Sequence, residues 1–272
     1  YGNNTIYVHK SNTQFANKFL FDKCIEEFNF NQNYETVYKM NLALKTISFN
    51  YYQPNLYPEL LHMTKFLDFS KAFDGNSRLF NFNEKENYEG CRYLEKMDID
   101  KNKFICLLIR NNEYYDSIGM SDRNEKMQFR NVDTKNYIKT IEFLINEGYK
   151  VIRMGKGFKE VFPFKDDSFI DYALSDYRSD FLDVWLSANC KFFLSSSCGL
   201  GSLPMVFNKP FLFSNLFPVG RILSFAPLSS HVPRNVVYND KLLSIKEMIE
   251  LDIIYKNDSN LFSKLGINIL EN

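Results

Sequence analysis

Residues 96–272 predict an α/β fold in which parallel strands form a doubly wound sheet between layers of helices. Apolar, strand-like runs alternate along this region with segments of helical period, and the connections between them are short. The first run, KFICLLIR at 103–110, is apolar almost throughout, as is typical of a strand buried on both faces of a parallel sheet. Ligands bind such sheets beyond the carboxyl ends of the strands, so the residues that follow each strand are the candidates for a site.

The other elements follow from hydrophobic period and from turn residues. In TKNYIKTIEFLINEGY, residues Tyr137, Ile141 and Ile145 repeat at helical spacing, and Gly148 ends the helix as a C-terminal glycine commonly does. Ser179 is a suitable N-cap for a helix over 179–190. The remaining predicted elements are a polar loop over 111–133, strands over 150–155, 169–174, 191–196 and 210–215, a short helix over 199–209, and two amphipathic helices in the tail, 243–272.

The first 95 residues predict a separate, smaller region. A strand is expected at TIYVHK, and a helix over 12–28 places Phe15, Phe19 and Ile25 on one face. Aromatic-rich segments continue to residue 70, and the polar, turn-prone stretch over 74–90 is a candidate linker. The boundary between the two regions, 1–95 and 96–272, is therefore predicted near residue 95.

Charge and cysteine content exclude several classes of protein. The 33 basic and 33 acidic residues balance, so no overall field draws the chain to nucleic acid or to an anionic membrane. The five cysteines form no CxxC pair, which speaks against a zinc site or a disulfide framework and favours a reducing compartment. No apolar stretch reaches about 18 residues and no signal peptide is evident, so we expect a cytoplasmic protein without a transmembrane segment.

The stretch KFFLSSSCGLGSLPMVFNKP, residues 191–210, runs from an apolar strand into a loop rich in serine and glycine. A serine-nucleophile elbow would need glycine where Ser195 stands, and Cys198 would need a histidine or a helix N-terminus to become a nucleophile. The glycines match neither a P-loop nor a dinucleotide fingerprint. We favour a phosphate cradle in which backbone N–H groups and serine hydroxyls face the anion, with a purely structural turn as the alternative.

Basic residues also follow the predicted strands. Arg110 ends CLLIR, and Arg153 precedes Gly155 in VIRMGKG. A guanidinium is a rigid fork of donors suited to a diphosphate, and strand ends meet at one edge of a sheet, so the arginines and the serine loop predict one shared anion site. Further candidates are Lys156 and Arg130 for the anion, and Asp171 and Tyr172 for a ribose or base, with helix capping as an alternative role for Asp171.

Four stretches carry a series of motifs in the order of a known family. They are FICLLIRNNEYYD, FRNVDTKNYIKTIEFLINEGYKVIRMG, IDYALSDYRSDFLDVWLSANCKFFLSSSCGL and VFNKPFLFSN. In this order the chain resembles a bacterial family of GT-B-like glycosyltransferases found with surface-polysaccharide synthesis genes, and more distantly the fucosyltransferase group. The resemblance implies a Rossmann-type donor-binding domain over 96–272 with a reduced or truncated acceptor-side α/β region over 1–95.

The resemblance also implies site residues by position, with Arg110 as the ligand of the donor diphosphate. The other matching positions are Arg130, Asn131 and Asp133, then Arg153 and Gly155, then Asp171 and Tyr172, and finally Ser196, Ser197, Gly199 and Leu200, with Ser195 in the same loop. The sequence departs from the family at Leu108, where the family has histidine, and at Asn111, where it has aspartate. Cys198 also stands between the serines and Gly199.

The expected function is transfer of a sugar from a nucleotide-sugar donor to a glycan or lipid-linked acceptor, without a metal. No D-x-D motif follows a predicted strand, so fixed donors are expected to stabilise the leaving diphosphate. The candidate catalytic residues are Arg110 and, as a base, Glu113, Asp116 or His9.

Two other classes of function stay open beside this one. A sugar-nucleotide epimerase or hydrolase of the same fold would turn over the donor without an acceptor. A non-catalytic module would instead bind a glycan or protein partner through the aromatic stretch over 48–61. We expect no nucleic-acid partner, and contact with the periphery of the inner membrane is left open.

Overall fold

The computed structural model describes residues 17–28, 81–119, 121, 127–196, 198–222 and 228–272. The chain divides into two compact units, Tyr1–Phe69 and Ser70–Asn272. In the first unit the described residues form helix α1, Lys18–Phe28, which confirms the helix predicted there. The strand expected at TIYVHK and the aromatic stretches up to residue 70 lie outside the described residues.

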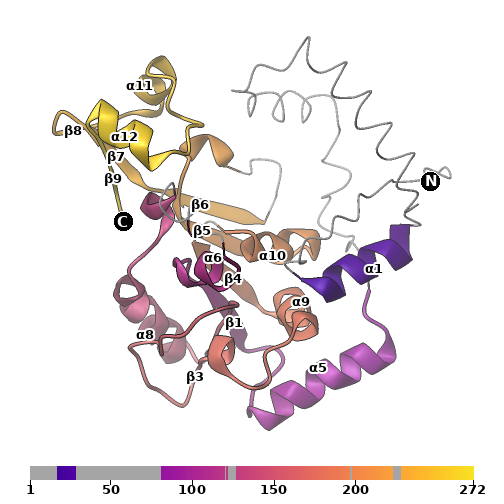
Figure 1. Ribbon diagram of the computed structural model, residues 1–272. Helices are drawn as coiled ribbons and strands as arrows, with labels where there is room; N and C mark the ends of the chain where they lie inside the picture. The colour runs from indigo at the N-terminus through magenta and orange to yellow at the C-terminus, as the bar shows by residue number, and fades with distance from the viewer. Residues whose placement is uncertain (1–16, 29–80, 120, 122–126, 197, 223–227) are drawn as a thin grey trace. The chain divides into compact units, whose positions relative to one another are not determined.

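The second unit is built on a six-stranded parallel sheet with the strand order β3-β2-β1-β4-β5-β6 (Figure 1). This is the order of a Rossmann fold, in which the direction of winding reverses between β1 and β4. The predicted doubly wound α/β fold is therefore confirmed. The strands are β1 Phe104–Leu108, β2 Lys150–Arg153, β3 Phe169–Ile170, β4 Phe192–Ser196, β5 Phe211–Leu216 and β6 Ser229–Pro233.

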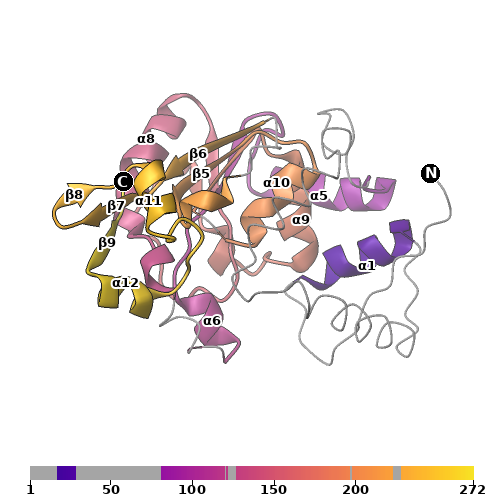
Figure 2. The same ribbon diagram turned by 90° about the horizontal axis from the view of Figure 1, so that it is seen from above.

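Helices cover both faces of this sheet. Helix α8, Ile138–Asn146, lies on one face, and α9, Asp180–Asn189, lies on the other with α10, Leu203–Val206 (Figures 1 and 2). Ser179 caps α9 as predicted, because its hydroxyl accepts a hydrogen bond from the Leu182 amide at 3.1 Å. The helix-and-strand alternation read from the sequence thus places each crossover helix correctly.

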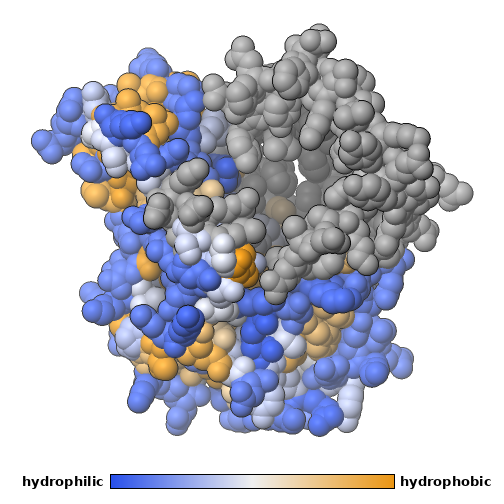
Figure 3. Space-filling model, viewed as in Figure 1, coloured by the Kyte–Doolittle hydropathy of each residue, from blue (hydrophilic) through white to orange (hydrophobic). Residues whose placement is uncertain are grey.

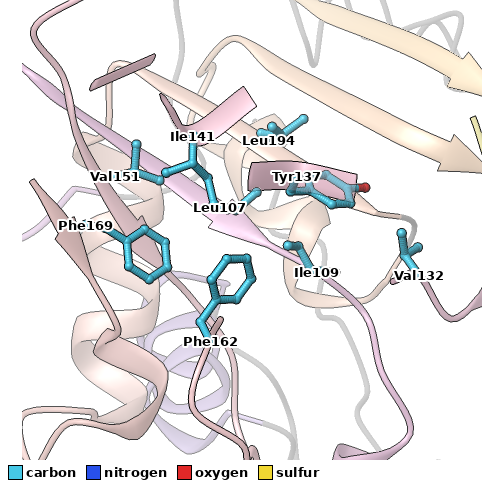
Figure 4. Close-up of a cluster of buried hydrophobic side chains, with 9 residues drawn as sticks. All are labelled: Leu107, Ile109, Val132, Tyr137, Ile141, Val151, Phe162, Phe169 and Leu194. Carbon is cyan, nitrogen blue, oxygen red and sulfur yellow. The ribbon is translucent and has the colours of Figure 1, made fainter. Parts of the chain in front are cut away.

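The core between α8 and the sheet is made of side chains that alternate along the strands. Leu107 of β1, Val151 of β2 and Leu194 of β4 form one buried cluster with Ile141 of α8 (Figure 4). All five residues of β1 are buried, which explains why its sequence is apolar without alternation. Since the core fixes the strands, it also fixes where the loops beyond their carboxyl ends begin.

The stretch predicted as a linker, 74–90, is in part a helix that packs within the second unit. Helix α5, Glu84–Lys96, begins with a capping box in which Asn83 and Glu86 exchange hydrogen bonds. Its Gly90 lies against α9, where an added Cβ would stand 2.1 Å from a ring carbon of Trp185. The polar composition came from the exposed side of an amphipathic helix. The linker prediction is therefore wrong over residues 84–90.

The loop predicted over 111–133 contains helices, and the strand predicted over 169–174 is shorter than expected. The loop contains helix α6, Glu113–Ser117, and the 3₁₀ turn η1, Gln128–Arg130. Beyond β3 the chain turns into a short 3₁₀ helix, η3, Tyr172–Leu174, instead of extending the strand.

Within the described residues, no helix has the length and apolar character needed to cross a membrane.

The C-terminal part of the second unit forms a small lobe. The sequence predicted the two helices of this lobe but not its sheet. Helices α11, Ile245–Glu250, and α12, Ser259–Leu265, pack Met248 and Phe262 into its core. Its antiparallel sheet of β7, Asn235–Tyr238, β8, Lys241–Leu242, and β9, Ile267–Leu270, was missed because the strands are very short. A lobe this small leaves apolar side chains exposed around α11 and α12, visible as orange patches at the upper left of Figure 3.

Candidate anion site

The carboxyl ends of β1 and β4 meet where the winding of the sheet reverses, and the backbone is cross-linked there. The amide of Arg110, two residues beyond β1, donates a hydrogen bond to the Ser196 hydroxyl at 2.6 Å. Ser196 is the last residue of β4, and both residues are buried. Ligands of open α/β sheets bind at this reversal point, so the structure brings two predicted site residues together at the expected place.

The Arg110 side chain is held in place while part of its hydrogen-bonding capacity is unused. The residue is 8% exposed, and its guanidinium carbon lies 5.1 Å from the centre of the Tyr115 ring, within cation–π distance. Its Nε and Nη2 atoms are buried and have no hydrogen-bond partner among the described residues. Buried polar groups are paired in the great majority of cases, so these donors are suited to an anionic ligand.

Two further arginines, Arg130 and Arg221, are coupled by charge to the same site. The pKa of Arg130 is lowered to about 10, first by burial and then by the positive charges of Arg110 and Arg221. Arg130 ends η1, and Arg221 ends the 3₁₀ turn η5, Val219–Arg221, just beyond β5. We call Arg110, Arg130 and Arg221 the arginine cluster. Because like charges raise one another's free energy at short range, an anion bound among them would relieve that repulsion.

The hydroxyls of Ser195 and Ser196 form hydrogen bonds within the protein. The Ser195 hydroxyl donates to the Ser196 carbonyl at 2.6 Å, and the Ser196 hydroxyl accepts from Arg110. An added Cβ on Gly201 would lie 2.5 Å from the Ser195 Oγ, so the tight packing of this loop requires glycine there. The two hydroxyls predicted to face a phosphate therefore have partners inside the protein.

The other loop residues occupy the start of the turn that follows. Gly199 is exposed, and Leu200 opens the 3₁₀ turn η4, Leu200–Ser202. Ser197 lies outside the described residues. A phosphate contact of Gly199 or Leu200 is thus a prediction that concerns their backbone N–H groups.

Cys198 is half-buried beside the arginine cluster. Its Sγ lies 3.7 Å from the Ser195 Oγ. Burial raises the pKa of the thiol, and this outweighs the lowering by a backbone hydrogen bond from Gly201, by Ser195, and by the charges of Arg110 and Arg130. The thiol is therefore neutral near pH 7, which does not fit an activated nucleophile.

We expect iodoacetamide to alkylate Cys198 slowly near neutral pH, with a rate still rising at about pH 9, because the thiol pKa lies above its ordinary value of 9.0. Pyrophosphate should slow the reaction further, since it would offset the arginine charges that favour the thiolate. The measurement is mass spectrometry of the Cys198 peptide across a pH series. A rate that levels off below about pH 8 would contradict the raised pKa.

Arg153 and Asp171, both predicted at the anion site, pair with each other. The Arg153 Nη1 donates to the Asp171 Oδ2 at 2.9 Å and to the Glu160 carbonyl at 3.1 Å. The guanidinium carbon lies 4.3 Å from the centre of the Phe158 ring. An added Cβ on Gly155, where φ is 141°, would stand 1.9 Å from that same ring. These contacts fix the connection between β2 and β3.

Tyr172 lies in the core, and this corrects its predicted role as a nucleoside contact. The side chain is fully buried, and its hydroxyl donates to the Asp183 Oδ1 at 3.0 Å and accepts from the Ser179 amide at 3.1 Å. Burial raises the pKa of Tyr172 far above its ordinary range. Lys156, the remaining basic candidate, lies 3.4 Å from the Asp180 carboxylate.

The predicted catalytic carboxylates lie on helix α6, directly after Arg110 in the chain. The Glu113 Oε2 accepts from the Lys159 amide at 2.8 Å, and the Asp116 Oδ1 accepts from the Ser121 hydroxyl at 3.0 Å. His9, the third candidate base, lies outside the described residues. Among the described residues, no group of three His, Cys, Asp or Glu side chains is placed to hold a metal ion. The base and the metal independence both stay predictions.

Sequence reasoning missed Arg221 and Tyr115. Arg221 lies in the first turn after β5, five residues beyond its end, so its place after a predicted strand was a usable signal. Tyr115 offered no such signal, because only the fold brings its ring against the Arg110 guanidinium.

Comparisons with known proteins give one structural likeness. No protein-family model matches the chain, and neither does any curated protein sequence. Among solved structures, the fold is similar to that of the ADP-heptose LPS heptosyltransferase II of E. coli, with 15% identity and a TM-score of 0.42. The match covers 64% of this chain and 52% of that chain, so the chain spans about half the length of this neighbour. A likeness at this level assigns no activity, substrate or partner to the chain.

Proposed function

We propose that the arginine cluster binds the diphosphate of a nucleotide-sugar donor, and that the chain transfers the sugar to a glycan or lipid-linked acceptor. The observation that carries the proposal is the Arg110 side chain, which is buried at the reversal point with two donors that have no partner among the described residues. The family resemblance of the sequence supports the same assignment, including a role in bacterial surface-polysaccharide synthesis.

A diphosphate fits the cluster better than a carboxylate or a single small anion. The charges of Arg110 and Arg221 act on Arg130 strongly enough to lower its pKa, and a guanidinium is a flat fork of donors that matches phosphate oxygens. A ligand with two or more negative charges offsets more of their mutual repulsion than a ligand with one. The position at the reversal point of a Rossmann-type sheet favours a nucleotide as the carrier of that diphosphate.

The proposed mechanism uses the cluster to stabilise the leaving group. As the bond from the sugar to the diphosphate breaks, negative charge grows on the diphosphate oxygens, and fixed positive donors lower the energy of that transition state. Because Tyr115 and the backbone bond to Ser196 already hold Arg110, little reorganisation is needed when the charge develops. Glu113 or Asp116 on α6 would accept the proton of the acceptor hydroxyl.

The test is a thermal-shift and calorimetric screen of UDP, GDP, CMP and their sugar conjugates, each with magnesium and with EDTA. We expect a nucleoside diphosphate to raise the melting temperature by several degrees at about 100 times its Kd. The shift should be equal in magnesium and in EDTA, and CMP should give a smaller shift than the diphosphates. The base that gives the largest shift identifies the donor.

The outcomes of the screen separate the classes of function. Release of free diphosphate from a bound donor without any acceptor would favour the hydrolase alternative. Failure of every nucleotide and of inorganic pyrophosphate to bind would contradict the proposal and favour a non-catalytic module. Binding that needs magnesium would contradict the metal-independent form of the mechanism.

A further inference from the structure

The segment Arg130–Asp133 carries one member of the arginine cluster, and it is fixed on the side that faces β1. The Val132 amide donates to the Arg110 carbonyl at 3.2 Å. This bond ties the backbone two residues after Arg130 to the backbone of Arg110, although the charges of the two arginine side chains repel each other. A single backbone bond contributes only about 1 kcal/mol, so contacts from the opposite side decide whether the segment keeps its place.

Arg234 supplies a contact from that opposite side. Its side chain is 2% exposed, and its Nη2 donates to the Asn131 carbonyl, the residue after Arg130, at 2.5 Å. Its own amide donates to the Leu216 carbonyl at 3.0 Å, which anchors it to the end of β5. A charged donor with so little access to water holds its acceptor firmly.

Glu271 completes the arrangement beside Arg234. Its Oε1 lies 3.9 Å from the Arg234 Nη2, and its carboxylate accepts from the Asp133 amide at 3.1 Å and from the Asn136 Nδ2 at 2.7 Å. Burial lowers the pKa of Arg234, and the Glu271 charge acts in the opposite direction. The carboxylate thus balances the buried cation and adds a second anchor on the same segment.

We propose that Arg234 and Glu271 are positioning residues, which clamp the segment after Arg130 and hold its guanidinium beside Arg110. Their hydrogen bonds go to the backbone at Asn131 and Asp133, so they set where Arg130 stands without being its counter-ions. The clamp matters because the two side chains that it brings together would otherwise move apart. The anion that uses this geometry is the one named in the proposed function, on which this inference rests.

The experiment compares the whole chain with Glu271→Gln, Arg234→Met and Arg234→Lys. The control is Glu247→Gln, the same substitution in the same lobe, which removes an ion pair with Lys241 instead. One readout needs no ligand: the pH profile of Cys198 alkylation, because Arg130 lowers the pKa of that thiol. The other readout is the affinity for inorganic pyrophosphate by calorimetry.

We expect Glu271→Gln and Arg234→Met to move the alkylation profile to higher pH by about half a unit. Pyrophosphate affinity should fall about tenfold, because the site loses its preorganised geometry. Arg234→Lys, which keeps the charge and one donor to Asn131, should recover part of that loss. Glu247→Gln should match the parent chain in both readouts.

The two readouts separate this inference from the proposed function. If the parent chain does not bind pyrophosphate but the profile still moves, the positioning role stands and the donor assignment fails. If the parent chain binds and folded Glu271→Gln binds equally well, the positioning role is overturned. An unmoved profile in folded Glu271→Gln also overturns it, and this variant keeps Arg234 in place should Arg234→Met fail to fold.

Discussion

Arg110→Met should abolish donor binding and leave the ligand-free chain at least as stable as before. Methionine keeps most of the buried length of the side chain while removing a charge with two donors that the described part of the chain leaves unpaired. It also removes the repulsion that lowers the pKa of Arg130. Replacing a poorly compensated buried charge with an apolar side chain is often neutral or stabilising, so we expect a gain of about 0–1 kcal/mol in the free energy of unfolding.

The loss of affinity should be large because the variant lacks charge-assisted hydrogen bonds that few other groups can replace. Bonds of this kind contribute about 1.5–3 kcal/mol each, so the loss of two should reach roughly 100- to 20,000-fold in Kd for the nucleoside diphosphate. Denaturant unfolding and calorimetry measure the two effects on one preparation. Arg92→Met, at an exposed arginine of α5, is the matched control and should change neither.

The opposite pattern would show that Arg110 has a structural role. A variant that is less stable by more than about 2 kcal/mol and still binds the diphosphate would mean that the guanidinium supports the β1 loop. The opposed signs of the two expected effects matter, since general unfolding would lower stability and affinity together. Sites whose charges are arranged for a ligand commonly give up stability in its absence.

The sequence predicted those elements of the fold that have a clear local pattern. The buried run of β1, the period of α8 and the Ser179 cap of α9 are local features, and the structure confirms all three. Strand β6 was missed because its sequence, SSHVP, is mostly polar, and β8 was missed because two residues carry too little period to detect. Helix α5 was missed because its polar, exposed side dominated its composition.

The site shows the same division between local and tertiary information. Sequence position was enough to bring Arg110 and the serine loop to one edge of the sheet, because strand ends must meet there. It could not separate Arg110 from Arg153, since both follow strands and only the fold gives Arg153 a carboxylate partner in Asp171. Nor could it show that Tyr172 points into the core, because a residue after a two-residue strand has no fixed direction.

Gly90→Ala should destabilise the second unit by about 3 kcal/mol, although alanine favours a helix over glycine by about 1 kcal/mol. The added Cβ would stand 2.1 Å from one ring carbon of Trp185 and within 2.6 Å of two more. The Trp185 ring is fully buried and its Nε1 donates to Asn87 of α5 at 3.3 Å, so it has no open space to enter. Overpacking at a rigid contact costs about 1–3 kcal/mol or more.

Thermal unfolding should show this loss as a fall of about 6–12 °C in melting temperature for a unit of this size. Glu89→Ala, at the exposed neighbouring position on α5, is the control and should change the melting temperature little. Pairing Gly90→Ala with Trp185→Phe should give less than the sum of the two losses, because the smaller ring makes room for the methyl group. Full additivity would mean that α5 and α9 do not meet at this contact.

The same variant also tests whether the sheet isolates the anion site from its supporting helices. Helix α9 leads into β4, yet Ser196 and Arg110 are joined beyond the strand ends by their own hydrogen bond. If that bond and the clamp on Arg130 set the site geometry, Gly90→Ala should bind pyrophosphate with unchanged affinity at temperatures where it is fully folded. A tenfold weaker affinity in the folded variant would instead mean that strain at α5 reaches the arginine cluster through β4.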